Sequence, residues 1–295
     1  MAESFSPLAI LKKWVDALTE ELPQVLGGHV KAIHRTRVAT RRLREVLPVA
    51  VRDRQTTKDL SRRLRDVNRI LGPVRELDVL AQLIAEPEGR YSVAALSTAV
   101  RRARREASGR LEISARKLRK LAWRLNDAVA DVQSSEAVAV DLRKVRRNWL
   151  WAIQARIIQR ASRVRSAMDH AGVLYASGPL HDVRVSIKKL RYAIELSDEI
   201  GEFQPGAVRT LRRTQDLLGR QHDLEILLLW GRQAQLSEPQ TANWRELSSL
   251  TRAIERDCRE LHARYIRERT ALTALISRIG SISDSGTVAV ERAVG

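Results

Sequence analysis

Apolar residues recur along most of the chain at spacings of three and four, which is the period of a helix buried on one side. Strand-like alternation of apolar and polar residues is scarce. A first helix is predicted after Ser6-Pro7, because Ser is a favoured N-cap and Pro a favoured first residue. Pro23 and Gly27-Gly28 are predicted to interrupt it before the helix that contains His34 begins. The pattern therefore indicates an all-α protein.

Further helices follow from the same period. The second is predicted to end near Pro48, and a third to begin near Thr57. Residues 86–92 are typical of a loop, a fourth helix is expected from about Val93, and a long basic helix over 140–170. Short connections favour antiparallel neighbours, so these segments predict up-and-down helix bundles.

One stretch of the chain occurs twice. Residues 34–45 read HRTRVATRRLRE, and residues 181–195 read HDVRVSIKKLRYAIE. At an offset of 147, His34 matches His181, Arg37 matches Arg184, and the three cations that follow are matched by cations. A repeat of this kind indicates an internally duplicated fold.

Two more segments extend the repeat. LGPVRELDVL at 71–80 matches LGRQHDLEIL at 218–227, with Gly72 opposite Gly219. ALSTAVRRARRE at 95–106 resembles ELSSLTRAIERD at 246–257, at an offset of 151. A glycine inside a helix costs about 1 kcal/mol relative to alanine, so close helix packing or a kink is expected at both glycines. Glu76 and Asp223 are predicted to be structural partners of buried cations.

The repeats define the domain organisation. We expect a first four-helix repeat over 1–136, a second over 137–280, and a flexible tail over 281–295. The polar segment 131–137 is the predicted linker. The predicted fold class is all-α, with two antiparallel four-helix bundles related by a pseudo-twofold axis.

Each copy of the repeated stretch has one cationic side. At about 100° per residue, His34, Arg37, Arg41 and Arg44 lie within one quadrant, and Ala39 and Leu43 lie opposite. The second copy places its matching residues in the same way: His181, Arg184, Lys188 and Arg191. Like charges spaced at three and four residues destabilise a helix by a few tenths of a kcal/mol per pair, so we expect an anion or acidic partners to compensate. We predict that the two rows face one another across a shared groove.

Composition supports an anionic partner. The formal net charge is +18, and only nine of the 53 basic residues are lysine. Arginine binds phosphate oxygens with a planar fork of donors, and the charge predicts salt-sensitive association with a polyanion. Cys258 is the only cysteine, which excludes an intramolecular disulfide and argues against a cysteine-based zinc site. No apolar run is long enough for a membrane span and no signal peptide is evident, so a cytoplasmic location is expected.

The pattern H-x-x-R-V-x-x-[RK]-[RK]-L-R, present twice and followed each time by L-G-x-x-x-[DE], resembles the CHAD domain, the conserved histidine α-helical domain. The resemblance covers roughly residues 5–280. It implies two four-helix bundles with internal symmetry, non-catalytic binding of inorganic polyphosphate, and targeting to polyphosphate granules. It implies no cofactor, no metal and no catalytic residue.

The resemblance and the repeat together give the predicted polyphosphate-binding residues. In the first repeat they are His34, Arg37, Arg41, Arg42, Arg44, Arg65, Arg101 and Arg105. In the second they are His181, Arg184, Lys188, Lys189, Arg191, Arg212, Arg252 and Arg256. Arg42 and Lys189 lie about 80° round the helix from their histidine and so fit the rows less well.

Other functions stay open at this point. Non-specific nucleic-acid binding is compatible with the charge, but no recognition motif is evident, and Trp123, Trp149 and Trp230 are predicted to be core rather than stacking surfaces. An enzyme such as a phosphatase is disfavoured because no nucleophile motif or carboxylate cluster stands out, and His170, His222 and His262 are scattered. A structural protein of another kind of storage granule is a further alternative.

Overall fold

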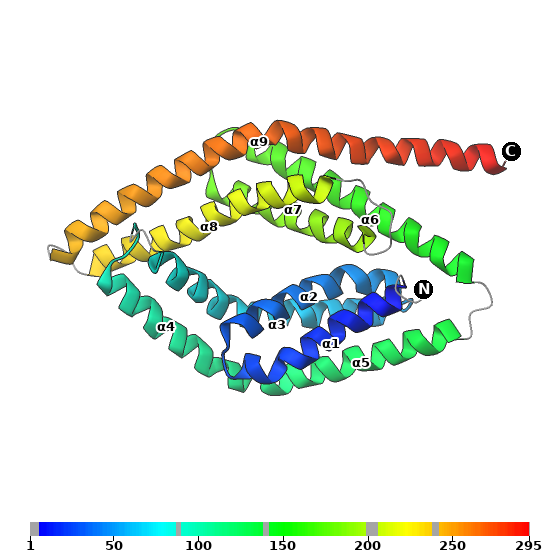
Figure 1. Cartoon of the computed structure of the whole chain (residues 1–295), viewed down its shortest axis with the longest axis horizontal. Coiled ribbons are helices and arrows are strands. Elements are labelled where there is room, and N and C mark those ends of the chain that lie inside the picture. The colour runs from blue at the N-terminus through cyan, green and yellow to red at the C-terminus, as the bar shows by residue number, and fades with distance from the viewer. Residues whose placement is uncertain (1–5, 87–89, 138–141, 199–205, 238–241, 295) are drawn as a thin grey trace. The chain divides into compact units, whose positions relative to one another are not determined.

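The structure, a computed structural model, describes residues 6–86, 90–137, 142–198, 206–237 and 242–294. These residues form nine α-helices and no strand, as Figure 1 shows, so the predicted all-α class is confirmed. The helices are α1 (Pro7–Leu26), α2 (Val30–Ala50), α3 (Arg54–Ile84), α4 (Ala94–Ile113), α5 (Ala115–Ala137), α6 (Leu142–Ala171), α7 (Ser177–Asp198), α8 (Ala207–Ser237) and α9 (Ala242–Val294).

The chain divides into two compact units, Met1–Leu150 and Trp151–Gly295. The predicted linker 131–137 is the end of α5, and the boundary between the units falls inside α6 rather than at residue 136. The repeat relates α1, α2 and α3 to α6, α7 and α8, and it relates α4 and α5 together to α9. The pseudo-twofold relation between the units stays a prediction.

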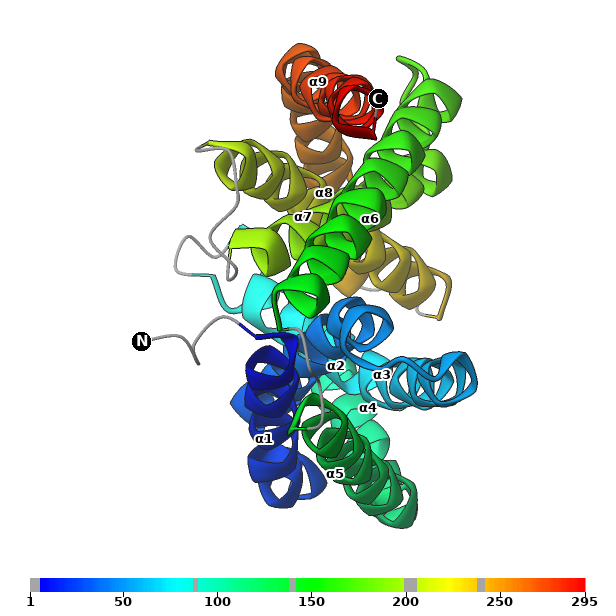
Figure 2. The ribbon, with the colours of Figure 1, turned by 90° about the vertical axis from the view of Figure 1, so that its right-hand side faces the viewer.

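In the first unit α1 packs against α2 and α5, α2 against α3, and α3 against α4 and α5 (Figure 2). The contacts are made by the apolar stripes of these helices. Leu11, Leu43, Leu64 and Leu71 are completely buried. Each such leucine contributes about 1.5–3 kcal/mol relative to an exposed one, so this core fixes how α2 is rotated about its axis.

The ends of the first helices follow from local chemistry. Ser6 caps α1 by accepting a hydrogen bond from the amide of Ala9 at 3.0 Å, and Gly28 leaves the helix with a φ of 74°, a conformation that favours glycine. The third helix begins earlier than predicted, because Asp53 is its N-cap. The Asp53 carboxylate accepts from the amides of Gln55 and Thr56, and its pKa is lowered by hydrogen bonding to the Thr56 side chain first and then to these two amides.

The first unit has five helices where four were predicted. The long helix that follows α3 breaks at Ser114, whose amide bonds to Leu111 O in a tighter turn, so α4 and α5 take the place of one helix. Its counterpart α9 has no such break and continues to Val294. Residues 281–294 are therefore helical, whereas the sequence predicts a flexible tail there. They contain no proline, and extending an existing helix gains one hydrogen bond per residue.

In the second unit α8 packs against α7 and α9. The end of α6 is joined to α9 by Arg269, whose guanidinium donates to the carbonyls of Gly172 and Met168. Leu211, Leu218, Ile187 and Leu272 are among the buried core residues.

Within the described residues no helix is long and apolar enough to cross a membrane.

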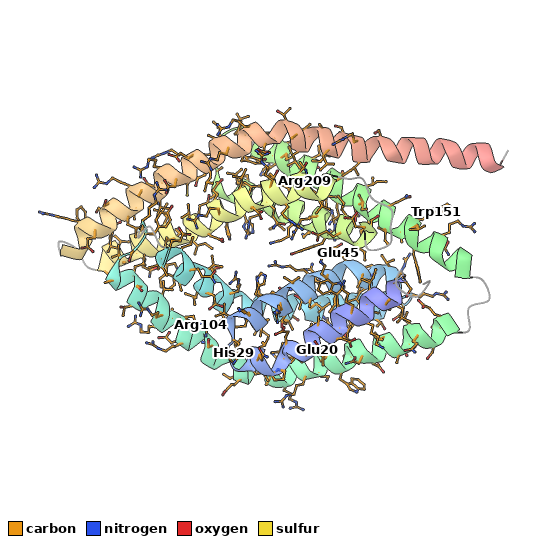
Figure 3. All side chains as sticks on the ribbon, viewed as in Figure 1. Glu20, His29, Glu45, Arg104, Trp151 and Arg209 are labelled. Carbon is orange, nitrogen blue, oxygen red and sulfur yellow. The ribbon has the colours of Figure 1, made fainter. Side chains whose placement is uncertain are left out.

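The tryptophans differ in their exposure to solvent. The prediction that Trp123 belongs to the core is wrong, because its side chain is 66% exposed, whereas Trp149 and Trp230 are partly buried. Trp151 (Figure 3) is exposed as well.

Candidate functional site

The row on α2 has the predicted orientation. Ala39, Leu43 and Val46 are buried in the core, while His34 is exposed and Arg37 and Arg41 are partly exposed. The 3.6-residue period of the helix separates these two faces. Because one face of α2 is packed into the core, its row of cations is held on the opposite face.

Arg37 is anchored to the neighbouring helix. Its Nη1 donates to the backbone carbonyl of Asn68 in α3 at 2.7 Å. The side-chain amide of Asn68 in turn donates to Thr40 Oγ1 at 2.6 Å, so α2 and α3 are joined by a short polar chain. This bond sets the direction of the guanidinium on the α3 side of α2.

The repeated glycines lie beneath the repeated arginines. A Cβ atom on Gly72 would lie 3.6 Å from Nη1 of Arg37, and one on Gly219 would lie 4.0 Å from Nε of Arg184. The close approach predicted at these glycines is therefore that of an arginine side chain from the preceding helix. The same arrangement in both units indicates that it belongs to the site and not to chance packing.

Burial and nearby cations both favour the neutral form of His34. Partial burial lowers the pKa of His34, and the nearby charges of Arg75, Arg41 and Arg37 lower it further. Its imidazole is therefore neutral at pH 7 and offers one donor and one acceptor. Arg75 reaches this surface from α3 and was missed as a site residue.

In the second unit His181, Arg184 and Lys188 form the equivalent row on α7. His222 of α8 joins them, with its ring centroid 4.8 Å from that of His181. Burial lowers the pKa of His222 to about 4, with the charges of Arg184, His181 and Lys188 acting in the same direction. The pKa of His181 is lowered by burial and then by Arg184 and Lys188.

The contact between His222 and His181 shows that His222 is not an isolated histidine, contrary to the interpretation from the sequence. The repeat contained the signal that would have found it, because His222 matches Arg75 at the offset of 147, three residues after each glycine. Both units thus add one basic residue from the glycine-bearing helix to the row on the preceding helix.

Some predicted site residues lie elsewhere. The guanidinium of Arg42 lies over the indole of Trp14 in α1, 5.4 Å from the ring centroid. Arg191 lies over the ring of Tyr192 and pairs with Glu195 at 3.4 Å, with its side chain only 14% exposed. Arg212 pairs with the same carboxylate at 3.5 Å. Arg191 and Arg212 therefore already have an acidic partner.

The remaining predicted residues are at least partly exposed. Arg44 and Lys189 are partly exposed, and Arg65 is exposed on α3. Four arginines, exposed on α4 and α9, make no hydrogen bond or ion pair with a row residue within the described part of the chain: Arg101, Arg105, Arg252 and Arg256. The structure thus brings together His34, Arg37 and Arg41, and separately His181, Arg184 and Lys188.

Asp78 is a buried acid of the first unit that pairs with an arginine, whereas Glu76 is exposed, and its predicted role as a partner of cations stays a prediction. The buried carboxylate of Asp78 accepts from Nε of Arg104 at 2.9 Å. Arg104 (Figure 3) also donates to the carbonyl of Gly28 at 2.5 Å. The matching acid in the second unit, Glu225, accepts instead from the hydroxyl of Tyr175 at 2.9 Å.

This arrangement can bind anions. No group of three or more metal-ligating side chains occurs in the part of the chain that the structure describes. The rows combine fixed guanidinium and ammonium groups with neutral imidazoles, which bind phosphate oxygens through charge-assisted hydrogen bonds. Fold and site together define an all-helical protein built from two related units, each with a cationic face.

The chain belongs to the CHAD domain family, whose sequence profile matches residues 9–232. Among solved structures it is similar to the CHAD domain from the plant Ricinus communis, with 20% identity, a TM-score of 0.56, and coverage of 94% of this chain and 90% of that one. It is also similar to PptA from Streptomyces chartreusis, with 19% identity, a TM-score of 0.53, and coverage of 92% and 97%. At these identities the likeness concerns the fold. A comparison with curated protein sequences finds no match.

Proposed function

We propose that this protein binds inorganic polyphosphate, without catalysing a reaction on it, through the rows on α2 and α7. The observation that carries the proposal is the repeated placement of Arg37 over Gly72 and Arg184 over Gly219, each beside a neutral histidine. Family membership supports it, since the residues that form the rows, His34, Arg37 and Arg41 with their counterparts in the second unit, are among the motif residues of the resemblance.

Polyphosphate suits these rows for chemical reasons. It is a linear anion that repeats one group and has no base to be read, so it needs spaced cations and hydrogen-bond donors. Bound counterions are released when such a polyanion is neutralised, and the affinity should fall steeply with salt, by analogy with nucleic acids. Attachment of the protein to polyphosphate granules in the cytoplasm follows from the same proposal.

Arg41 and Lys188 provide a sharp test. They match one another in the repeat, and each acts on the histidine of its own row. Replacing both by glutamate leaves the bond from Arg37 to Asn68 in place. We expect Arg41→Glu/Lys188→Glu to lower the affinity for long-chain polyphosphate at least tenfold at physiological salt, with the circular dichroism unchanged.

The matched control makes the same change of charge at an unrelated place. Arg119 and Lys120 are exposed on α5, outside both rows. Arg119→Glu/Lys120→Glu should keep the polyphosphate affinity within twofold. Equal losses in the two variants would mean that the net charge acts without a site, and the proposal would fail.

Nucleic-acid binding is the second candidate, because Trp123 is 66% exposed and follows Arg119 and Lys120 by one helical turn. An exposed indole beside cations can stack on the bases of a single strand. If this is the function, Trp123→Ala and Arg119→Glu/Lys120→Glu will weaken the binding of single-stranded DNA at physiological salt, and Arg41→Glu/Lys188→Glu will not.

A further inference from the structure

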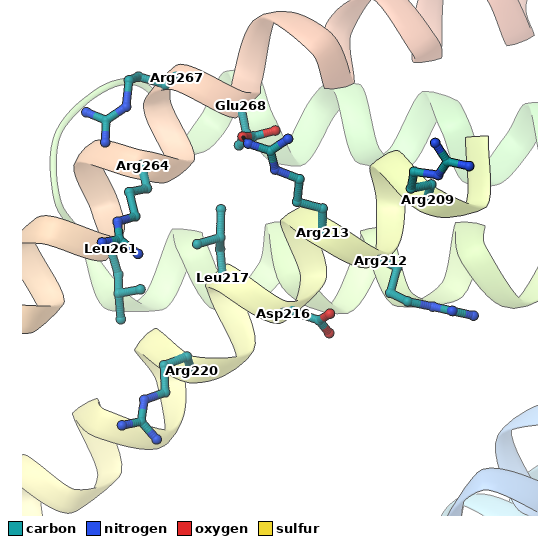
Figure 4. A pocket seen from close by; sticks show the side chains of 10 residues that line it. All are labelled: Arg209, Arg212, Arg213, Asp216, Leu217, Arg220, Leu261, Arg264, Arg267 and Glu268. Carbon is teal, nitrogen blue, oxygen red and sulfur yellow. Dashed lines mark ion pairs between the residues drawn. The ribbon is translucent and has the colours of Figure 1, made fainter. Parts of the chain in front are cut away.

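The second unit contains a cavity that the rows do not use. It lies between α8 and α9, is open to solvent, has a volume of about 800 Å³, and is shown in Figure 4. Arginines dominate its lining: Arg209, Arg212, Arg213 and Arg220 from α8, with Arg264 and Arg267 from α9. Only two carboxylates, Asp216 and Glu268, accompany these six guanidinium groups.

The arginines follow from the register of the two helices. On α8 they recur at spacings of three, four and seven, so they share one face. Leu217 of α8 and Leu261 of α9 are the apolar members of the lining, and Figure 4 shows Leu217 pointing toward α9. Apart from these two leucines, cations dominate the lining on both helices.

The charge of this cavity is only partly compensated. Arg213 forms an ion pair with Glu268, and Arg212 pairs with Glu195 of α7. Arg209, Arg264 and Arg267 are exposed and make no ion pair within the residues that the structure describes. Like charges at these spacings destabilise both helices, so an anion with several charges would relieve the repulsion.

We infer that this cavity is a second anion site, distinct from the rows, which binds a compact molecule carrying three or more phosphate groups. Its volume is in the range of pockets that hold small ligands rather than that of an extended groove. Guanidinium groups approach it from two helices, so each phosphate can be bound by bidentate contacts. Leu217 and Leu261 add an apolar surface for a carbon ring, which inorganic polyphosphate lacks.

The test uses the full-length chain, isothermal titration calorimetry at physiological salt, and inositol hexakisphosphate as the probe. We expect one site per chain. Arg264→Glu/Arg267→Glu should weaken its binding at least tenfold and leave the affinity for long-chain polyphosphate within twofold. Arg264→Gln/Arg267→Gln, a milder change, should weaken it about threefold or more, and both variants should keep the helicity of the parent.

Two controls separate this inference from the proposed function. Arg41→Glu/Lys188→Glu should keep the binding of inositol hexakisphosphate within twofold, even where it abolishes polyphosphate binding. Arg119→Glu/Lys120→Glu should do the same. If the probe binds the cavity variants as tightly as the parent, or if either control variant loses it equally, the cavity is not the site and the inference is overturned.

Discussion

His181 and His222 lie with their ring centroids 4.8 Å apart, although 40 residues separate them in the chain. Both pKa values are lowered, first by burial and then by Arg184 and Lys188. A bound polyanion acts in the opposite sense, since its negative charge favours the imidazolium form. Binding and protonation of this pair should therefore be linked.

We predict that polyphosphate binds more tightly as the pH falls from 7.5 to 5.5. The bound chain raises the histidine pKa values, so protons are taken up on binding and the affinity rises by about three- to tenfold. His222→Gln should remove about half of this increase. His170→Gln, at an exposed histidine on α6, is the control and should leave it unchanged. A parent protein whose affinity does not vary with pH would contradict the link.

The same pair affects stability without ligand. The folded pKa of His222 is about 4, against an ordinary value of 6.5 in the unfolded chain. The neutral form is therefore favoured by folding, and this contribution is complete above pH 6.5 and is lost as the pH falls toward 4. Urea unfolding at pH 7 and pH 5 should show a smaller loss of unfolding free energy for His222→Gln than for the parent. Equal losses would mean that His222 titrates normally.

The helices and the rows could largely be predicted from the sequence. Apolar period and capping residues place α1 and α2 to within a few residues, and the repeat identifies His34, Arg37 and Arg41 with their partners. These features depend on local geometry, which a single helix already specifies. The start of α3 was misplaced only because Asp53, its cap, precedes the apolar stripe.

What failed depends on contacts between helices. The helical wheel puts Arg191 in the row, but it shares the carboxylate of Glu195 with Arg212, which approaches from α8. Arg42 faces Trp14, a contact that requires knowing which side α1 packs on. His222 joins the row from α8, and the cavity between α8 and α9 requires the register of two helices. None of these contacts can be predicted from the apolar periodicity of a single helix.

Gly72 lies under the Arg37 guanidinium, and two substitutions there should have different effects: one on stability and one on polyphosphate affinity. In Gly72→Ala the new Cβ would lie 3.6 Å from the guanidinium, an ordinary contact, so helix propensity should stabilise the protein by up to about 1 kcal/mol with binding retained. Gly72→Leu should displace Arg37 and lower the polyphosphate affinity several-fold. Thermal unfolding and titration measure the two effects.

Gly109 is the matched control, because it lies in α4 with nothing within 4 Å of its added Cβ. Gly109→Leu should gain helix propensity and keep its affinity. If Gly72→Leu also keeps full affinity, the position of the Arg37 guanidinium does not matter for binding.

The last prediction concerns the buried pair of Asp78 and Arg104. The Asp78 side chain is 4% exposed and that of Arg104 is 23% exposed, so removing the carboxylate leaves a largely buried guanidinium without its counter-charge. We expect Asp78→Ala to lower the unfolding free energy by about 3 kcal/mol, as for other broken buried pairs. Because the pair joins α3 to α4 and, through Gly28, to the turn before α2, the whole first unit should be destabilised.

Asp66 is the control that tests whether burial makes the loss of the Asp78–Arg104 pair so destabilising. It pairs with Arg69 at 3.0 Å, but the two side chains are 49% and 81% exposed, so Asp66→Ala should change the unfolding free energy by less than about 0.5 kcal/mol. Below the denaturation temperature both variants should bind polyphosphate like the parent, because neither carboxylate belongs to the rows. A stable Asp78→Ala protein with reduced affinity would instead place Asp78 in the binding site, and its role as the structural acid would have to be abandoned.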